Sequence, residues 1–184
     1  MKKIFGALVI ALLAIGANAQ TFEKGSSIVT AQLGIGGGFG QRVAYEYSLM
    51  NLLDGKAAIG VGGSLNNCFS SNKNKGDWGK EKWGHNTFTV TAIGSFHYEF
   101  IDKLDTYVTI GLGGGAYTST HKIDYSNEYK EDGYKDYKDS YTNGCFGWVS
   151  SLGARYYFNN NWAANAELGW TGAGYFAIGA TYKF

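Results

Sequence analysis

Apolar and polar residues alternate with a period of two along most of the chain. In the last ten residues the apolar side chains share one parity, and the small or polar side chains share the other. The apolar positions are Phe176, Ile178, Ala180, Tyr182 and Phe184. Such alternation predicts a β-strand with one apolar face. Aromatic residues at both ends of that face suit the two interfaces of a bilayer, with smaller apolar residues between them for its interior.

The same pattern recurs upstream and predicts eight strands in total. They cover residues 27–35, 42–49, 57–65, 87–100, 107–117, 146–158, 162–170 and 175–184. Seven of them have at least nine residues and the strand over residues 42–49 has eight, close to the roughly 9 to 11 residues that a tilted strand needs to cross a bilayer. Short turns connect most of the strands. Two long polar segments, residues 66–86 and 118–144, are predicted to be surface loops on the same side of the membrane.

Charged residues occupy one parity of the predicted strands. None lies at an outward, apolar position, and the inward set is Arg42, Glu46, His97, Glu99, Arg155, Glu167 and Lys183. A Lys or Arg facing lipid near the bilayer midplane costs about 2 to 4 kcal/mol. A soluble eight-stranded barrel would show the reverse arrangement, with charges outside. The pattern therefore predicts an all-β fold, an eight-stranded antiparallel up-and-down transmembrane β-barrel.

The first 19 residues have the features of a secretory signal peptide. Two lysines follow Met1, residues 4–15 form an almost unbroken apolar run, and Ala17-Asn18-Ala19 fits a small-x-small cleavage site. The run is shorter than the roughly 20 residues that a transmembrane helix needs. We predict a signal peptide over residues 1–19 and one barrel domain over residues 20–184.

Composition supports strands and gives no electrostatic reason to expect nucleic acid as a partner. The chain has 28 Gly, 14 Tyr, 11 Phe and no Pro, so strand-forming aromatics are frequent and strand breakers are absent. A net charge of +1 provides no long-range field for nucleic acid. We expect a monomer without a cofactor.

The terminal Phe184, the turn over residues 100–107 and the run over residues 153–158, together with the eight-strand pattern, resemble the small outer-membrane β-barrel family of OmpA/OmpX type. The resemblance implies a location in the bacterial outer membrane, surrounded by its lipid. It also implies that periplasmic chaperones and the barrel-assembly machinery handle the chain, and that the machinery reads the final strand with Tyr182 and Phe184. Because the chain ends at the last predicted strand, we expect no peptidoglycan-binding domain.

Five polar side chains are predicted to face the lumen at similar depth: Gln32, Glu46, His97, Arg155 and Glu167. Eight strands leave an interior that side chains can just fill. Enclosed charges need partners, so Arg155 is expected to pair with Glu46, Glu167 or both and to plug the barrel. A proton or ion path through the same groups is the alternative.

The sequence offers little support for catalysis or metal binding. His97 and Glu99 share one inner face, but no nucleophilic Ser or Cys stands at a recognisable spacing, so we expect no enzyme. The alternative is a lipid-modifying enzyme that uses His85 or His121 with a nearby serine. The acidic residues of 118–144 do not follow the spacing of an EF-hand loop, and we expect no metal site.

The two long polar segments are rich in aromatic side chains. They are Trp78, Trp83, Tyr125, Tyr129, Tyr134, Tyr137 and Tyr141. Such side chains offer rigid contact area at small entropic cost. The sequence thus favours a non-enzymatic scaffold that displays loops for adhesion, surface interaction or envelope stability. Two alternatives remain: a merely solvated loop, or an extension of the fifth and sixth strands above the membrane.

Cys68 and Cys145 are both predicted at the outer rim with inward parity. An oxidising compartment favours a disulfide. The predicted third and sixth strands lie nearly opposite each other, however, and bridged Cα atoms must be within about 7 Å. A disulfide and two free thiols remain equal alternatives.

Overall fold

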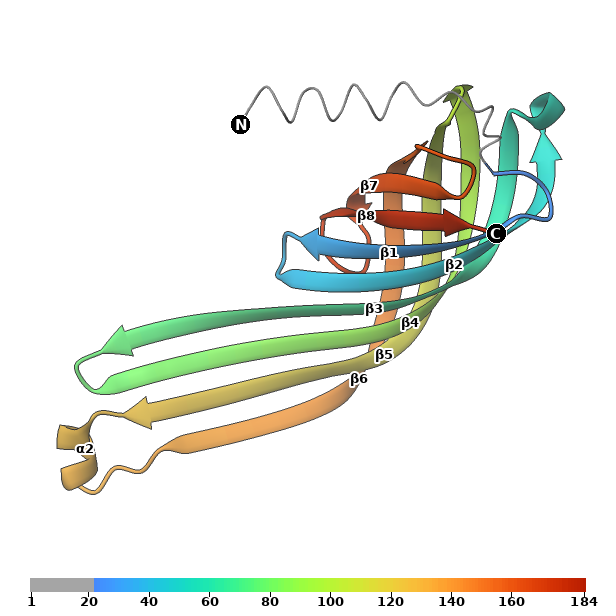
Figure 1. Ribbon diagram of the computed structural model, residues 1–184. Coiled ribbons are helices and arrows are strands. Elements are labelled where there is room, and N and C mark those ends of the chain that lie inside the picture. Colours follow the sequence, from blue (N-terminus) through green and yellow to red (C-terminus); the bar gives the residue numbers. More distant parts are fainter. Residues whose placement is uncertain (1–21) are drawn as a thin grey trace, which may run out of the picture.

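The computed structural model describes residues 22–184 and contains a closed barrel of eight antiparallel strands (Figure 1). Each strand pairs with its neighbours in sequence, and β1 pairs with β8 to close the ring. The strands are β1 (Ser27–Ile35), β2 (Phe39–Leu52), β3 (Ala57–Gly76), β4 (Gly79–Ile101), β5 (Leu104–Tyr125), β6 (Tyr137–Tyr157), β7 (Trp162–Trp170) and β8 (Phe176–Lys183). This confirms the predicted fold class. The predicted signal peptide, residues 1–19, lies outside the described residues.

Two short helices lie in the connections, η1 (Leu53–Gly55) between β2 and β3 and α2 (Asn127–Glu131) between β5 and β6. Among residues 22–184 no helix is long and apolar enough to span a membrane.

The barrel wall separates side chains as the alternation predicts. Large apolar side chains are exposed on the outside, among them Leu33 at 54%, Ile110 at 64% and Leu152 at 59%. The inward positions hold polar and charged residues, and Arg42 and Glu46 are each only 2% exposed. The barrel therefore has its apolar surface outside and its ionic side chains inside.

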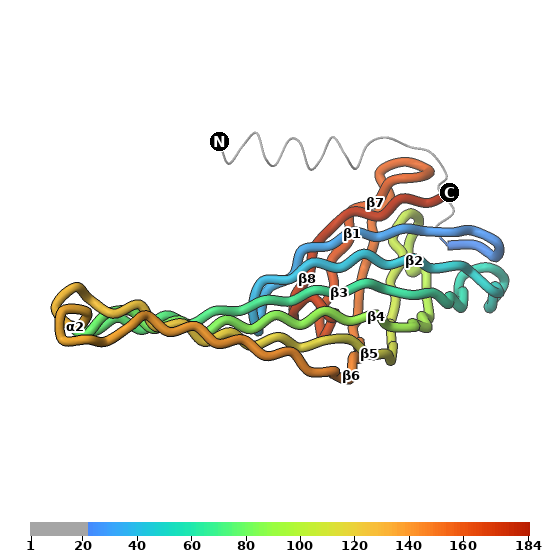
Figure 2. The backbone as a smooth tube through the Cα atoms, turned by 90° about the horizontal axis from the view of Figure 1, so that it is seen from below, coloured from blue at the N-terminus to red at the C-terminus, as the bar shows by residue number. Residues whose placement is uncertain are grey.

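Four of the strands are much longer than the others. β3 to β6 contain 20 to 23 residues, whereas the remaining strands contain 8 to 14. β2 pairs with β3 only as far as Phe69, and β7 pairs with β6 only from Ser150 onward. Beyond these points β3 to β6 continue as a four-stranded sheet that extends away from the barrel (Figures 1 and 2). We call residues 70–85 and 119–141 the projecting sheet.

The prediction of two long surface loops, residues 66–86 and 118–144, is therefore wrong. Strand pairing continues from the barrel to Gly76 and Gly79 in one hairpin, and to Ile123 and Tyr137 in the other. Above the apolar wall both faces of the sheet meet water, so the apolar half of the alternation disappears while the backbone pairing persists. The alternative of a strand extension holds for β5 and β6, and β3 and β4 extend in the same way.

Candidate functional site

Arg155 on β6 is at the centre of one buried ionic cluster in the lumen. Its Nη2 donates to Glu46 Oε1 on β2, and its Nη1 donates to Asp105 Oδ2 on β5 at 3.3 Å. The guanidinium carbon also lies 3.9 Å from the centre of the Tyr107 ring. None of these four residues is more than 2% exposed. A buried guanidinium is thus matched by two carboxylates and an aromatic face.

His97 belongs to the same cluster. Its Nδ1 lies 2.9 Å from Asp105 Oδ2, and its Nε2 lies 2.8 Å from Ser95 Oγ. Ser95 donates its own proton to Glu46 Oε2 at 2.6 Å. Because Ser95 gives its proton to Glu46, its oxygen can accept from Nε2 while the Asp105 carboxylate accepts from Nδ1, an arrangement that favours a proton on both ring nitrogens of His97.

A second cluster forms around Glu167 on β7. Arg42 donates to one carboxylate oxygen at 2.8 Å, and Ser151 donates to the same oxygen at 2.8 Å. Gln32 and the Tyr107 hydroxyl donate to the other oxygen at 2.8 and 2.9 Å. Tyr107 thereby connects the two clusters, since its ring faces Arg155 and its hydroxyl binds Glu167.

The buried network of the lumen contains three basic and three acidic side chains. The members are Arg42, Arg155 and His97 against Glu46, Asp105 and Glu167. Every one of them is at most 2% exposed. Each buried charge has an opposite partner, as burial in a low dielectric requires.

The five expected lumen residues all lie in this network. Arg155 contacts Glu46, which is one of its two expected partners, and Glu167 is bound by Arg42. Sequence reasoning left out Arg42 as a partner and placed Asp105 in a turn, although β5 begins at Leu104. Asp105 shares the inward parity of Tyr107, and this parity could have placed Asp105 in the lumen from the sequence.

A glycine makes room for the connecting tyrosine. A Cβ atom on Gly153 would lie 2.3 Å from Cζ of Tyr107 and 2.7 Å from its hydroxyl oxygen. Gly153 pairs directly with Tyr107 across β5 and β6. Any side chain at this position would push the Tyr107 ring away from Arg155 and Glu167.

Buried segments lie at both ends of the lumen. At the end near the projecting sheet, the β7–β8 connection folds inward, with Ala173 fully buried and Thr171 Oγ1 donating to Gly174 O at 2.9 Å. A Cβ on Gly40 would lie 1.9 Å from the Ala173 carbonyl oxygen, so this close approach requires glycine. At the opposite end the Phe22 ring lies 4.3 Å from the ring of His97.

Ser95, His97 and Asp105 have the connectivity of a serine-hydrolase triad, with Ser Oγ at Nε2 and the carboxylate at Nδ1. Sequence reasoning missed the nucleophile because Ser95 and His97 are neighbours on one strand face. The group is buried, however, and Ser95 is 6% exposed. Its hydroxyl proton is already directed at Glu46. The ring nitrogens of His97 contact Asp105, Ser95 and Glu46. 

One face of the projecting sheet continues the lumen side and presents aromatic side chains. Trp83 stacks on His121 with ring centres 3.7 Å apart, and His121 Nε2 lies 2.8 Å from Glu81 Oε1. Trp83, Tyr137 and Tyr141 are 41%, 47% and 54% exposed. We call this the aromatic face.

The remaining aromatic residues of the former loop prediction gather at the tip of the sheet. Tyr125 contacts Trp78, Tyr129 and Tyr134, with ring centres 5.3 to 6.5 Å apart. Lys130 Nζ donates to Asp136 at 2.8 Å, and the Tyr125 backbone N–H also donates to this carboxylate. These hydrogen bonds hold the pKa of the Asp136 carboxyl below its ordinary value. The seven expected contact residues thus lie in two groups rather than on two flexible loops.

The predicted alternative of a Cys68–Cys145 disulfide is not realised. Both thiols are free, with Cys68 buried on β3 and Cys145 half-buried on β6. β4 and β5 lie between these strands. Three inter-strand steps of about 4.8 Å separate the residues by about 14 Å along the wall, beyond the reach of a disulfide.

The last strand ends in an aromatic group on the outer surface. Tyr182 contacts the rings of Trp162 and Phe184 at 4.9 and 5.0 Å, and the Phe184 backbone N–H donates to Ser27 O at 2.9 Å.

Within residues 22–184 no three His, Cys, Asp or Glu side chains are grouped so as to hold a metal ion.

No protein-family model matches the chain, and no curated protein matches its sequence. Among solved structures, the chain is similar to Ail, the attachment invasion locus protein of Yersinia pestis. The TM-score is 0.42 at 16% identity, over 88% of this chain and 99% of that chain. A structure of Ail in complex with the heparin analogue sucrose octasulfate gives a TM-score of 0.40 at 15% identity, over 86% and 96%.

Proposed function

We propose that the protein is an integral, non-enzymatic β-barrel of the bacterial outer membrane that displays the projecting sheet as a binding surface. The observation that supports this proposal is the division of charge across the barrel wall. Exposed side chains on the outside of the wall, such as Val43, Val108 and Ile178, are apolar. The ionic side chains are buried in the lumen. Lipid favours this arrangement and water disfavours it.

The two ends of the barrel differ in the way that outer-membrane barrels do. One end has short connections, namely η1 and the turns at residues 102–103 and 159–161. The other end has the projecting sheet. Longer extramembrane segments face the outside of the cell in this class of protein. We therefore orient the projecting sheet toward the cell exterior and both described chain ends toward the periplasm.

The buried network supports a plugged lumen. An eight-stranded barrel has room for its own side chains and little more. Here the lumen contains six paired charges, with Ala173 buried at one end and Phe22 at the other. We infer that the lumen stabilises the barrel and does not conduct. Purified protein in planar bilayers is expected to give no stable channel, and a reproducible unitary conductance would contradict the plug.

The aromatic face supports a role in surface interaction, whether adhesion or contact with other envelope components. Three large aromatic side chains, Trp83, Tyr137 and Tyr141, are about half exposed on one face of a rigid sheet. Half-exposed aromatic groups on a preformed surface favour binding because little entropy is lost.

The assembly partners are the barrel-assembly machinery and periplasmic chaperones, with Tyr182 and Phe184 as the recognised strand end. We expect the folded protein to be a monomer.

Fractionation and surface labelling test the location and the orientation together. A cysteine-specific, membrane-impermeant label is applied to intact cells that carry Gly133→Cys in the tip or Asn160→Cys in the opposite turn, with Cys68 and Cys145 changed to Ser. We expect label at position 133 and none at position 160. The protein should also stay with the membrane after carbonate washing. Recovery as a soluble periplasmic protein would refute the location, and the reverse labelling pattern would refute the orientation.

The second candidate function is hydrolysis of a lipid ester, for which Ser95, His97 and Asp105 have the required connectivity once the Ser95 proton turns from Glu46 to a neutral His97. It requires a path from lipid to a hydroxyl that is 6% exposed. Lipid extracts from cells with wild-type protein and with Ser95→Ala distinguish the two functions. Unchanged acyl chains are expected for the scaffold.

A further inference from the structure

Four lysines form a row across the outer face of the projecting sheet. Lys73 on β3 pairs directly with Lys82 on β4, Lys82 pairs with Lys122 on β5, and Lys122 pairs with Lys138 on β6. Side chains of directly paired residues point to the same face. The sheet therefore presents one lysine from each of its four strands at one level. We call these residues the lysine row.

The row is confined to one face of the sheet. The adjacent inner positions at this level are Asn72, Trp83, His121 and Asp139, which belong to the aromatic face. The outer face carries two further lysines one step toward the tip, Lys75 and Lys80, which also pair with each other. The positive charge is thus concentrated on the side of the sheet that continues the apolar wall of the barrel.

Carboxylates of the protein neutralise only part of the positive charge of the lysine row. Within residues 22–184, the carboxylate contact of the row is that of Lys122 with Asp124 at 2.7 Å. Lys73, Lys82 and Lys138 are exposed. Like charges placed directly opposite each other destabilise a sheet. A ligand with several closely spaced negative groups would remove this repulsion.

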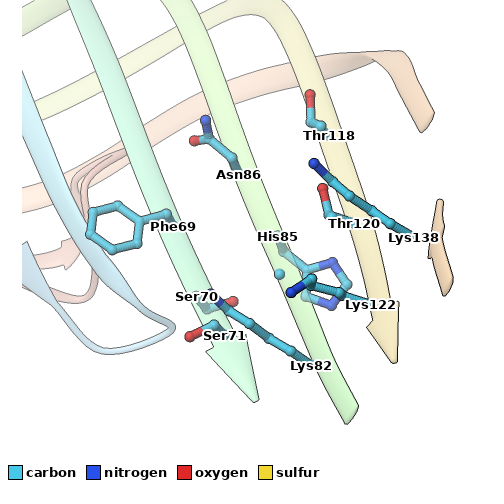
Figure 3. Close-up of a pocket in the computed structure, with 11 residues that line it drawn as sticks. Phe69, Ser70, Ser71, Lys82, His85, Asn86, Thr118, Thr120, Lys122 and Lys138 are labelled. Atoms are coloured by element: carbon cyan, nitrogen blue, oxygen red, sulfur yellow. The ribbon is translucent and has the colours of Figure 1, made fainter. Parts of the chain in front are cut away.

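A depression of about 460 Å³ accompanies the row (Figure 3). Lys82, Lys122 and Lys138 line it together with the hydroxyl groups of Thr118 and Thr120, which lie on the barrel side of Lys122. Ammonium and hydroxyl donors together suit phosphate or sulfate oxygens. The surface thus combines charge with neutral hydrogen-bond donors.

The height of the row above the apolar wall favours a ligand in the layer of lipid headgroups. Phe69 is the last large apolar side chain of the outer face on β3 and packs edge-on against Phe39. Lys73 follows four residues later, about 13 Å along the strand and about 10 Å above that level at the usual strand tilt. Long lysine side chains can reach down from this height into a headgroup layer.

We propose that the lysine row binds the phosphate groups of phosphorylated glycolipids in the outer leaflet around the barrel. This inference rests on the proposed membrane location. The row lies on the lipid-facing side of the strands, and its lysine side chains reach down into the layer of lipid headgroups. A lipid ligand therefore meets it without leaving the membrane. The aromatic face on the opposite side of the sheet stays free for another ligand.

The test compares two variants that lose the same charge. The row variant carries Lys73→Gln, Lys82→Gln and Lys138→Gln. The control variant carries Lys24→Gln, Lys56→Gln and Lys135→Gln, at exposed lysines outside the row. Each protein is refolded in nanodiscs of zwitterionic lipid, checked by gel mobility, and titrated with bis-phosphorylated lipid A or with the same lipid after removal of its phosphates.

Wild type and control are expected to bind the phosphorylated lipid at least about tenfold more tightly than the dephosphorylated lipid, and the row variant should lose this preference. Added salt should weaken the wild-type binding. Equal binding by the row and control variants would overturn the proposal. Heparin serves as a soluble sulfated probe, and row-dependent binding of heparin without row-dependent binding of lipid would also overturn it. Failure of the wild type to insert into nanodiscs would instead refute the proposed location, and the gel reveals it before any titration.

Discussion

Replacing Arg155 by Met should strongly destabilise the barrel, because it leaves two buried carboxylates, Glu46 and Asp105, with His97 as their remaining basic partner. Arg155 Nη1 lies 3.3 Å from Asp105 Oδ2, and Nη2 donates to Glu46. At 3.3 Å and an effective dielectric constant of about 20, one such attraction is worth about 5 kcal/mol. The desolvation of Arg155 itself offsets part of this gain. Breaking a buried pair in this way is expected to lower the free energy of unfolding by about 3 to 5 kcal/mol.

Two further variants show whether burial is the cause. Arg155→Met combined with Glu46→Gln removes the charge of one of the two carboxylates that lose Arg155. The double variant should therefore lose clearly less stability than the sum of the losses for Arg155→Met alone and Glu46→Gln alone. Lys130→Met removes the exposed pair with Asp136 at the tip and should leave the free energy of unfolding unchanged within error. It is the matched control, because it also takes a cation from a carboxylate.

Urea unfolding of the protein in lipid vesicles, followed by tryptophan fluorescence and gel mobility, measures Arg155→Met, Glu46→Gln, their combination and Lys130→Met. The reasoning fails if Arg155→Met costs less than about 1 kcal/mol, since the cluster would then be hydrated and the lumen open to water. Full additivity of the Arg155 and Glu46 changes would equally contradict direct pairing.

Three other outcomes follow from the lumen and the rim. A fluorophosphonate probe should leave Ser95 unlabelled in the folded protein, and stoichiometric labelling would establish the hydrolase alternative. Gly153→Ala should lower the free energy of unfolding by about 1 to 3 kcal/mol because its Cβ overlaps Tyr107, and an unchanged urea midpoint would show that the ring can move aside. Maleimide labelling after non-reducing denaturation should modify both Cys68 and Cys145, whereas protection of both would restore the disulfide.

The sequence was sufficient to predict the barrel because lipid imposes a strict rule on the outer wall. Any ion there is costly, so parity alone separates Leu33 and Ile110 on the outside from Glu46 and Arg155 on the inside. The same rule holds in every crossing, and eight repetitions leave little ambiguity in strand number or fold class. Inward parity likewise identified five members of the lumen network.

The projecting sheet and the pairing of charges were beyond the same reasoning. Above the membrane, water contacts both faces, so residues 70–85 lose the apolar signal that marks a strand even though their backbones stay paired. Pairing in the lumen depends on the stagger of the strands around the barrel. That stagger brings Arg42 to Glu167, although their strands are separated by β1 and β8. The alternation of apolar and polar residues along one strand does not determine the stagger or the register.

Each of the four long strands has two parts, one in the barrel and one in the projecting sheet, and the two parts differ in what their side chains do. Below Phe69 their inward side chains belong to the buried ionic network of the lumen. Above it the same parity carries the aromatic face, and the opposite parity carries the lysine row. If headgroup phosphates hold the lysine row, the aromatic face is turned away from the surrounding lipid. Because the strands are continuous, a rigid lumen then fixes the direction in which that face is presented.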